Sequence, residues 1–132
     1  MAISTGHVVA SDTGHPADYY TTDNRQFSTG AQRDNNDAKG RFDLLPPDAI
    51  MLVAQLFQKG ANHYGDRNWE KGQPLGVLLD SALRHTFKLM AGWTDEDHAV
   101  SAVWNLLCLI QTREWIKSGR LPGELNDLNI QL

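Results

Sequence analysis

Two consecutive segments, residues 75–91 and 95–117, carry apolar side chains on nearly every face that a helix would present. Both are longer than ordinary strands, so the pattern predicts helices. A helix that is apolar on most faces must be covered by neighbours on several sides. Only a short turn at residues 92–94 separates the two segments, which predicts antiparallel neighbours. We expect Thr94 or Asp95 to cap the second helix.

A third helix is predicted upstream of this pair. Pro46 and Pro47 suit a first helical turn, and Asp48 complements the positive end of the helix dipole. Apolar residues then recur at helical spacing to about Gly60 or His63. We find no strand pattern. Because three such helices leave more apolar surface than one chain of 132 residues can cover, we expect an all-α helical bundle completed by oligomerisation.

The composition of the chain changes near Lys39. Residues 1–38 are rich in Ser, Thr, Asp, Asn and Gly and show no sustained periodicity. We therefore expect a polar N-terminal arm at residues 1–38 and an all-α domain at residues 39–132. The arm is either a tail without function or a segment that orders against a partner subunit and helps a site. Its aromatic anchors are Tyr19, Tyr20 and Phe27.

Charge and cysteine content exclude several classes of protein. The net charge is −4, from 12 basic and 16 acidic side chains, which does not fit a general nucleic-acid binder. Cys108 is the single cysteine, so no disulfide forms within the chain and a reducing compartment is expected. The first residues lack the features of a signal peptide, and no apolar stretch is long enough to span a bilayer. These features predict a cytoplasmic protein without a membrane partner.

Polar residues form one stripe on each of the two apolar segments. In an antiparallel pair, His85 falls level with His98 and Ser101, and Asp80 lies near Asn105. Such groups are costly to bury unless they are paired or bind a charged ligand. The first stripe consists of Asp80, Arg84 and Lys88, flanked by Ser81 and His85, and the second of Asp97, Ser101, Asn105, Cys108 and Thr112, adjoined by His98.

These converging stripes predict a metal site, because carboxylates and imidazoles on facing helices commonly bind metals in bundles. The run Asp95-Glu96-Asp97 favours Mg²⁺ or Mn²⁺, and the adjoining His98 favours Mn²⁺ or another transition ion. Other interpretations stay open. Acidic residues in a first turn often only stabilise the helix dipole, an Asp80–Arg84 pair is often a surface salt bridge, and a histidine on an apolar helix is often a satisfied core residue.

The loop at residues 60–69 concentrates aromatic, amide and guanidinium groups between two glycines. Such groups suit the stacking and hydrogen bonding of a nucleobase. The alternative is a structural turn in which Trp69 closes one end of the bundle. Two cations, Lys39 and Arg41, lie upstream of this loop. They are interpreted either as contacts for phosphate oxygens or as a solvated basic pair.

Several ordered motifs together resemble the phage and bacterial dATP/dGTP diphosphohydrolase family. That family reads roughly K-x-R-x-D-L-L-P, G-A-x-x-Y-G-x-x-N-W-x-x-G and D-x-A-x-R-H, followed by an acidic segment with His before a Trp-Asn pair. Here the motifs are KGRFDLLPP at residues 39–47, GANHYGDRNWEKG at 60–72, DSALRH at 80–85, and DEDH with a later WN at 95–105. The resemblance covers residues 39–112.

The resemblance implies an all-α, MazG-like nucleoside triphosphate pyrophosphohydrolase. Such enzymes cut between the α and β phosphates, use Mg²⁺ or Mn²⁺, and assemble as dimers or tetramers. The phage MazZ branch prefers dGTP and supplies dGMP for 2-aminoadenine DNA. We therefore expect a purine dNTP as substrate, with dGTP favoured and dATP possible, and a location in the host cytoplasm for a phage-encoded chain.

The chain departs from its relatives in three respects. Gly92-Trp93 stands where many relatives have Gly-Glu, so one candidate carboxylate is missing. Ser101 stands where many have a second His before the Trp-Asn pair. The paired-glutamate signature E-E-x-x-E of better-known MazG-like enzymes is absent as well.

The resemblance and the polar stripes together predict the roles of individual residues. His85 is expected to act as ligand, general base or orienting group, and Asp97 to be catalytic. A nucleotide-binding module without turnover, a helical interaction protein, and an enzyme that removes phosphates stepwise remain the alternatives. Expected metal ligands are Asp80, Asp95, Glu96, Asp97 and His98, and expected substrate contacts are Lys39, Arg41, Tyr64, Asn68, Trp69, Arg84 and Asn105.

Overall fold

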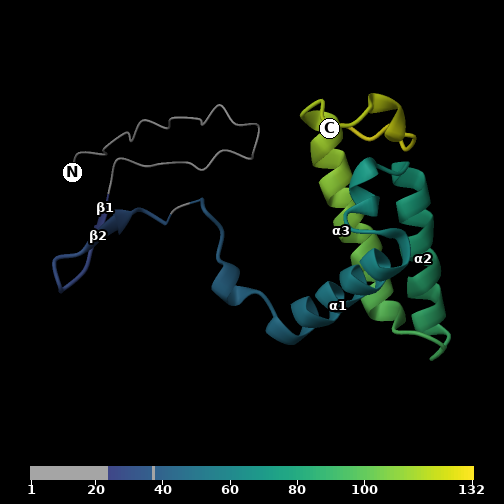
Figure 1. Ribbon diagram of the computed structural model, residues 1–132, viewed down its shortest axis with the longest axis horizontal. Coiled ribbons are helices and arrows are strands. Elements are labelled where there is room, and N and C mark those ends of the chain that lie inside the picture. Colours follow the sequence, from purple (N-terminus) through teal and green to yellow (C-terminus); the bar gives the residue numbers. More distant parts are fainter. Residues whose placement is uncertain (1–23, 37) are drawn as a thin grey trace. The chain divides into compact units, whose positions relative to one another are not determined.

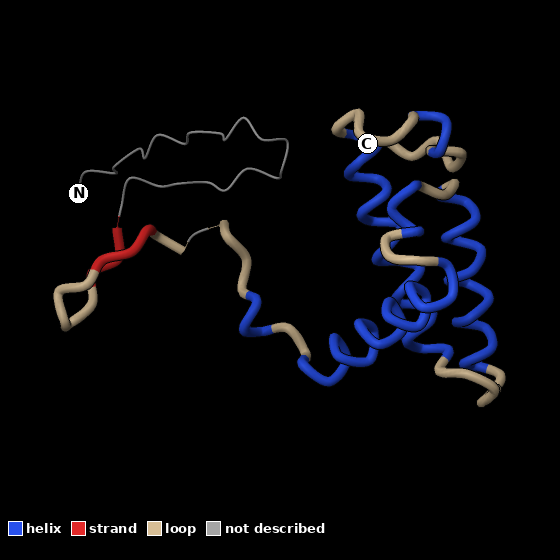
Figure 2. The backbone as a smooth tube through the Cα atoms, viewed as in Figure 1, coloured by secondary structure: helices blue, strands red, loops and turns tan. Residues whose placement is uncertain are grey.

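The computed structural model describes residues 24–36 and 38–132, which divide into two units at Leu45 and Pro46. The expected anchors Tyr19 and Tyr20 lie outside the described residues. Helices dominate the structure, as the sequence predicts (Figures 1 and 2). No described helix has the length and hydropathy needed to cross a membrane.

The first unit contains a β-hairpin, which corrects the expectation that the chain has no strands. β1 (Asn24–Gln26) pairs antiparallel with β2 (Gln32–Asp34). The turn between them uses Gly30 at φ 86°, a conformation that glycine adopts without steric cost. Strands of three residues are too short to show alternation in the sequence, which is why the pattern missed them. The single-turn 3-10 helix η1 (Phe42–Leu44) follows.

In the second unit, α1 (Pro47–Tyr64) begins at the predicted Pro-Pro step. It ends one residue beyond the predicted limit, where the N–H of Gly65 donates to the carbonyl oxygen of Ala61 at 2.8 Å. The short 3-10 helix η2 (Asn68–Lys71) then leads to α2 (Leu75–Met90). The start and end of α2 agree with the sequence prediction to within one residue.

α2 and α3 (His98–Lys117) pack side by side along their lengths, and α1 contacts α3 (Figure 1). The cap of α3 is Asp97, whose carboxylate accepts a hydrogen bond from the N–H of Val100 at 3.1 Å. The predicted caps, Thr94 and Asp95, were therefore wrong by two or more residues. The helix starts later because residues 91–97 are used to reverse the chain, with Gly92 at φ 76°.

The start of α2 is capped from far along the chain. Its N-cap residue, Pro74, provides no side-chain acceptor. Instead, Asp127 Oδ1 accepts a hydrogen bond from the N–H of Gly76 at 2.7 Å. Asp127 follows the 3-10 helix η3 (Gly123–Leu125), so the C-terminal segment satisfies a backbone donor that α2 leaves unpaired.

Within the chain, α3 buries its polar stripe and exposes an apolar one. Four polar side chains of this helix are buried, and His98 and Thr112 are each only 1 % exposed. Val103, Leu106, Leu107 and Ile110 on the same helix are 40–45 % exposed. The two other buried polar residues are Ser101 and Asn105.

An aromatic cluster joins η2 to α1 and α3. Trp69 stacks on Trp115 with ring centroids 5.5 Å apart and an interplanar angle of 7°. Phe57 meets the edge of Trp69 at 5.7 Å and also contacts Trp104 at 5.4 Å. The guanidinium of Arg120 covers the outer face of Trp115 at 3.9 Å. This cluster holds the loop after α1 against the end of the helical unit.

Candidate active site

Three groups converge where α2 faces the start of α3. The Nδ1 atoms of His85 and His98 lie 3.0 Å apart. Glu96 Oε1 lies 3.7 Å from His85 Nδ1 and 3.8 Å from His98 Nδ1. These three residues form a candidate metal cluster among the described residues. Their side chains range from fully buried at His98 to 42 % exposed at Glu96, so the cluster is open on the glutamate side.

The separations within this cluster fit a transition-metal ion. A point equidistant from three atoms so spaced lies about 2.1 Å from each, close to the length of a metal–imidazole bond. Two imidazoles and one carboxylate form a donor set that favours Mn²⁺ or another transition ion over Mg²⁺.

Asp95 positions His98 for this role. Its Oδ1 lies 2.7 Å from His98 Nε2, so Nε2 carries the hydrogen and donates it to the carboxylate. The lone pair of His98 then lies on Nδ1, which faces the cluster. A carboxylate that accepts the second N–H of a ligating histidine sets the ring orientation and raises its basicity. The same hydrogen bond, with the imidazole beside it, lowers the pKa of Asp95.

His85 is held in its neutral form. Burial lowers the pKa of its imidazole, and this effect outweighs the opposing influence of Glu96. Its side chain is 13 % exposed. A neutral imidazole retains the lone pair that metal ligation requires.

Glu96 is oriented by Ser101. The Ser101 hydroxyl donates to Glu96 Oε2 at 3.0 Å, while Oε1 faces the two histidines. Ser101 is itself buried on the first turn of α3. A serine at this position therefore supports the carboxylate rather than adding a further imidazole.

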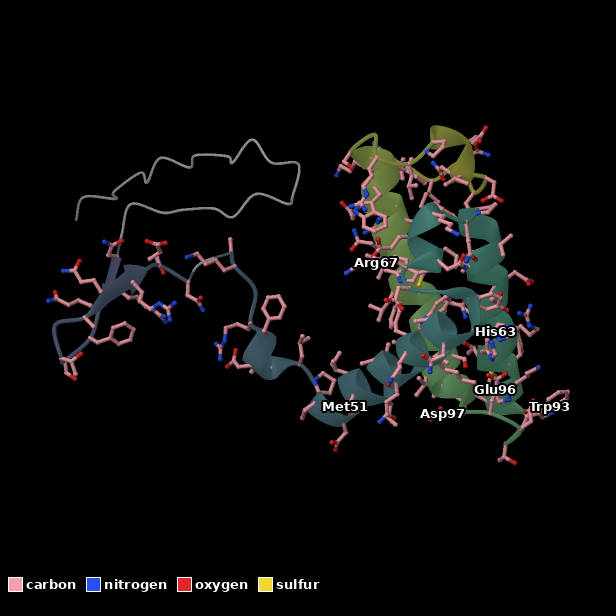
Figure 3. The ribbon with its side chains drawn as sticks, in the orientation of Figure 1. Met51, His63, Arg67, Trp93, Glu96 and Asp97 are labelled. Atoms are coloured by element: carbon pink, nitrogen blue, oxygen red, sulfur yellow. The ribbon has the colours of Figure 1, made fainter. Side chains whose placement is uncertain are left out.

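A cavity of about 1000 Å³ adjoins the cluster. His85, Glu96 and Asn105 form part of its wall. The second half of α1, the loop before η2, the start of η2 and further residues of α3 also line it. Figure 3 labels Glu96, with His63 and Arg67, which also line the cavity. Its volume is at the upper end of the range for small-molecule sites. The cavity thus connects the candidate metal cluster to the aromatic and amide groups that the sequence singles out.

The expected substrate residues of the loop do line this cavity. They are Tyr64, Asn68 and Trp69, and Asn105 from α3 joins them. Tyr64 is 68 % exposed and makes an edge contact with His63, with ring centroids 4.3 Å apart. Trp69 also belongs to the aromatic cluster, as the structural alternative expects, while its contact with a nucleobase stays a prediction.

Other expected site residues lie outside the cluster. Asp80 is 75 % exposed and pairs with Arg84 at 2.9 Å, which is the surface salt bridge that the sequence left open. Asp97 caps α3. Lys39 and Arg41 belong to the first unit, where Lys39 lies 3.8 Å from Asp34 and Arg41 makes a two-point bond with Asp43 at 2.7 and 2.8 Å.

Several cavity residues were not among the expected site residues. Lys59 lines the cavity from α1, and Arg67, paired with Glu70 at 2.7 Å, lines it from the loop. The signal for Lys59 was its spacing of four from His63, which places both on one helical face. Trp104 also lines the cavity, and its indole Nε1 is buried without a hydrogen-bond partner among the described residues. No sequence pattern identifies such a donor.

Comparison with known families adds an independent observation. Residues 29–118 match the family model described as dATP/dGTP diphosphohydrolase, N-terminal. This match spans more than half of the chain and includes all three helices in full. Neither the curated proteins nor the solved structures include one that matches this sequence.

Proposed function

Because the chain belongs to the dATP/dGTP diphosphohydrolase N-terminal family, we propose that it is a metal-dependent nucleoside triphosphate pyrophosphohydrolase. Its substrate is a purine dNTP, with dGTP favoured and dATP possible, and its products are the dNMP and pyrophosphate. The observation that carries this proposal is the convergence of His85, Glu96 and His98 beside a cavity of nucleotide size.

The two ends of the cavity suit the two ends of a nucleotide. His85 and Glu96 lie in its wall at one side, where bound metal would meet the phosphates. Tyr64, Asn68 and Trp69 provide an aromatic face and an amide for the base. Lys59 adds a cation that can contact phosphate oxygens. The phosphates therefore bind toward α2 and α3, and the base binds toward the loop after α1.

We assign His85, Glu96 and His98 as the residues that hold the metal. When bound, a divalent ion neutralises phosphate charge and polarises the phosphoryl oxygens. Asp95 orients His98, and Ser101 orients Glu96. Mn²⁺ is expected to support turnover better than Mg²⁺, because imidazole ligands disfavour Mg²⁺.

The exposed apolar side chains support assembly into a dimer or tetramer. α2 exposes Leu83, Phe87 and Met90, and α3 exposes Leu107 and Ile110, each at 40 % or more. Large apolar side chains left exposed on two neighbouring helices are typical of a protein–protein contact. We propose that a second copy covers it, and that the active enzyme is the cytoplasmic oligomer.

The test is product analysis. Purified protein is incubated with each dNTP and NTP in the presence of Mn²⁺, Mg²⁺ or chelator, and the products are separated by anion exchange. We expect one purine dNTP to give monophosphate and pyrophosphate with Mn²⁺, and none with chelator. Release of orthophosphate would replace this reaction with stepwise hydrolysis. Tight nucleotide binding without turnover would favour the nucleotide-binding module. The absence of both binding and turnover would favour the helical interaction protein.

Two matched variants test which carboxylate turnover requires, Glu96 or Asp97. Glu96→Gln removes a charged ligand and should abolish turnover, with metal binding weakened in parallel. Asp97→Asn keeps a good helix cap and leaves the three-residue cluster intact, so we expect it to retain activity. The sequence alone predicts the opposite for Asp97. Loss of turnover in Asp97→Asn with full activity in Glu96→Gln would therefore return the catalytic role to Asp97.

A further inference from the structure

The hairpin of the first unit gathers basic side chains around a small hollow. Arg25 from β1, Arg33 from β2 and Lys39 from the following segment line a cavity of about 280 Å³, together with Asp34 and Asn36. Among the described residues that line it, Asp34 is the one carboxylate, and it lies 3.8 Å from Lys39 Nζ. The described part of the lining therefore has three cations and one carboxylate, although the chain has a net charge of −4.

Two of these cations oppose each other directly. Arg25 and Arg33 are paired across the antiparallel strands, so their side chains leave the same face of the hairpin. Like charges in that position destabilise a strand pair, which an anion between them would relieve. Arg25 is also restricted, because its guanidinium lies 5.4 Å from the ring centre of Phe27.

We propose that this hairpin is a binding site for a phosphate oxyanion, and specifically for the polyphosphate group of a nucleotide or for pyrophosphate. Guanidinium groups bind such oxygens in a two-point geometry, and the Asn36 amide adds a neutral donor. Arg41 takes no part, because Asp43 already occupies its guanidinium at two points. The choice of polyphosphate as the ligand rests on the proposed function, whereas the oxyanion chemistry rests on the hairpin alone.

Direct binding of pyrophosphate to the full-length protein tests this site. Calorimetry is performed in chelator, so that the metal cluster does not contribute. The variants are Arg33→Gln, Arg25→Gln with Arg33→Gln, and Arg33→Lys, with Arg41→Gln as the matched control. We expect at least about a tenfold loss of affinity in Arg33→Gln, a larger loss in the double variant, and wild-type affinity in Arg41→Gln. The pyrophosphate affinity of Arg33→Lys should lie between those of the wild-type protein and Arg33→Gln, because lysine keeps the charge and loses the two-point geometry.

Three results would overturn the proposal: no measurable pyrophosphate binding by the wild-type protein, equal affinity in the double variant, or a short single-stranded DNA that binds more tightly than pyrophosphate and competes with it. The helical circular-dichroism signal of each variant confirms that the second unit is folded. Because the assay needs no turnover, it is independent of the proposed reaction. An inactive wild-type protein that still loses pyrophosphate binding in Arg33→Gln would retain the oxyanion site and reject the enzyme.

Discussion

The Nδ1 atoms of His85 and His98 lie 3.0 Å apart across the α2–α3 contact. Asp95 determines which of the two atoms carries the hydrogen in this contact. Because Nε2 of His98 carries the hydrogen and donates it in a hydrogen bond to Asp95, Nδ1 of His98 carries only a lone pair. Without metal, His85 Nδ1 must donate its hydrogen to that lone pair. A metal ion held by both histidines through Nδ1 would require a lone pair on each of these atoms. Metal binding at this point would therefore require the His85 hydrogen to move from Nδ1 to Nε2 of the same neutral ring.

Asp95→Ala should weaken metal binding about 10- to 100-fold, because His98 loses the carboxylate that fixes its tautomer and ring orientation. Isothermal titration with Mn²⁺, or the absorption spectrum of a Co²⁺ complex, measures this change without substrate. Asp97→Asn is the neighbouring control and should bind metal as the wild-type protein does. Unchanged Mn²⁺ affinity in Asp95→Ala would show that the Asp95–His98 bond does not support a metal site.

The metal-free protein should lose stability as the pH falls through about 6.5, the ordinary pKa of histidine. Burial lowers the pKa of His85 in the folded chain, so below that pH the unfolded chain takes up a proton that the folded chain does not. Urea unfolding at pH 7.5 and 5.5, in chelator, measures the effect. His85→Gln should show a smaller decrease in the urea midpoint between the two pH values. Equal decreases in both proteins would remove His85 as the source.

Asp127→Ala should lower the free energy of unfolding by about 1 kcal/mol, the usual effect of losing a helix cap. The reason is that the N–H of Gly76 loses its acceptor at the start of α2. Chemical unfolding followed by circular dichroism measures the change. Glu124→Ala, an exposed acidic residue in the same C-terminal segment, is the control and should change little. A destabilisation shared equally by both variants would point to a general charge effect.

Substitutions of Tyr64 and Trp69 should separate an effect on substrate binding from an effect on stability. Tyr64→Ala removes an exposed cavity side chain, so we expect a higher KM at nearly unchanged stability. Trp69→Ala removes the centre of the aromatic cluster and should destabilise the protein by about 3 kcal/mol. Steady-state kinetics and urea unfolding on both variants measure the two effects. A Tyr64→Ala variant with wild-type KM would exclude this side chain from base recognition.

Leu107→Glu should dissociate the proposed oligomer, because it places a charge in the exposed apolar stripe of α3. Light scattering coupled to size-exclusion chromatography measures the mass of each species. Lys117→Glu changes the charge at an exposed position of the same helix and serves as the control. A wild-type protein that elutes as a 14.7 kDa monomer would contradict the oligomer itself.

Neighbouring acidic residues show how far sequence reasoning reached into the site. Asp95, Glu96 and Asp97 are equivalent candidates in the sequence, yet the structure gives them three different partners. Asp95 contacts His98, Glu96 lies between the two histidines and Ser101, and Asp97 caps α3. The difference follows from where α3 begins. The sequence placed that start too early, because it did not reveal how many residues the reversal after α2 requires.

By itself, the sequence determined the three helices, their boundaries to within a few residues in most cases, and the level alignment of His85 with His98. These features depend on local apolar periodicity and on one short turn, both of which are written along the chain. Only the tertiary structure decided which polar group meets which. It left the Asp80–Arg84 pair at the surface and outside the candidate metal cluster, brought Asp127 to the start of α2, and formed a basic hollow beside two three-residue strands. Such contacts depend on side-chain direction and on residues distant in the chain, which periodicity does not encode.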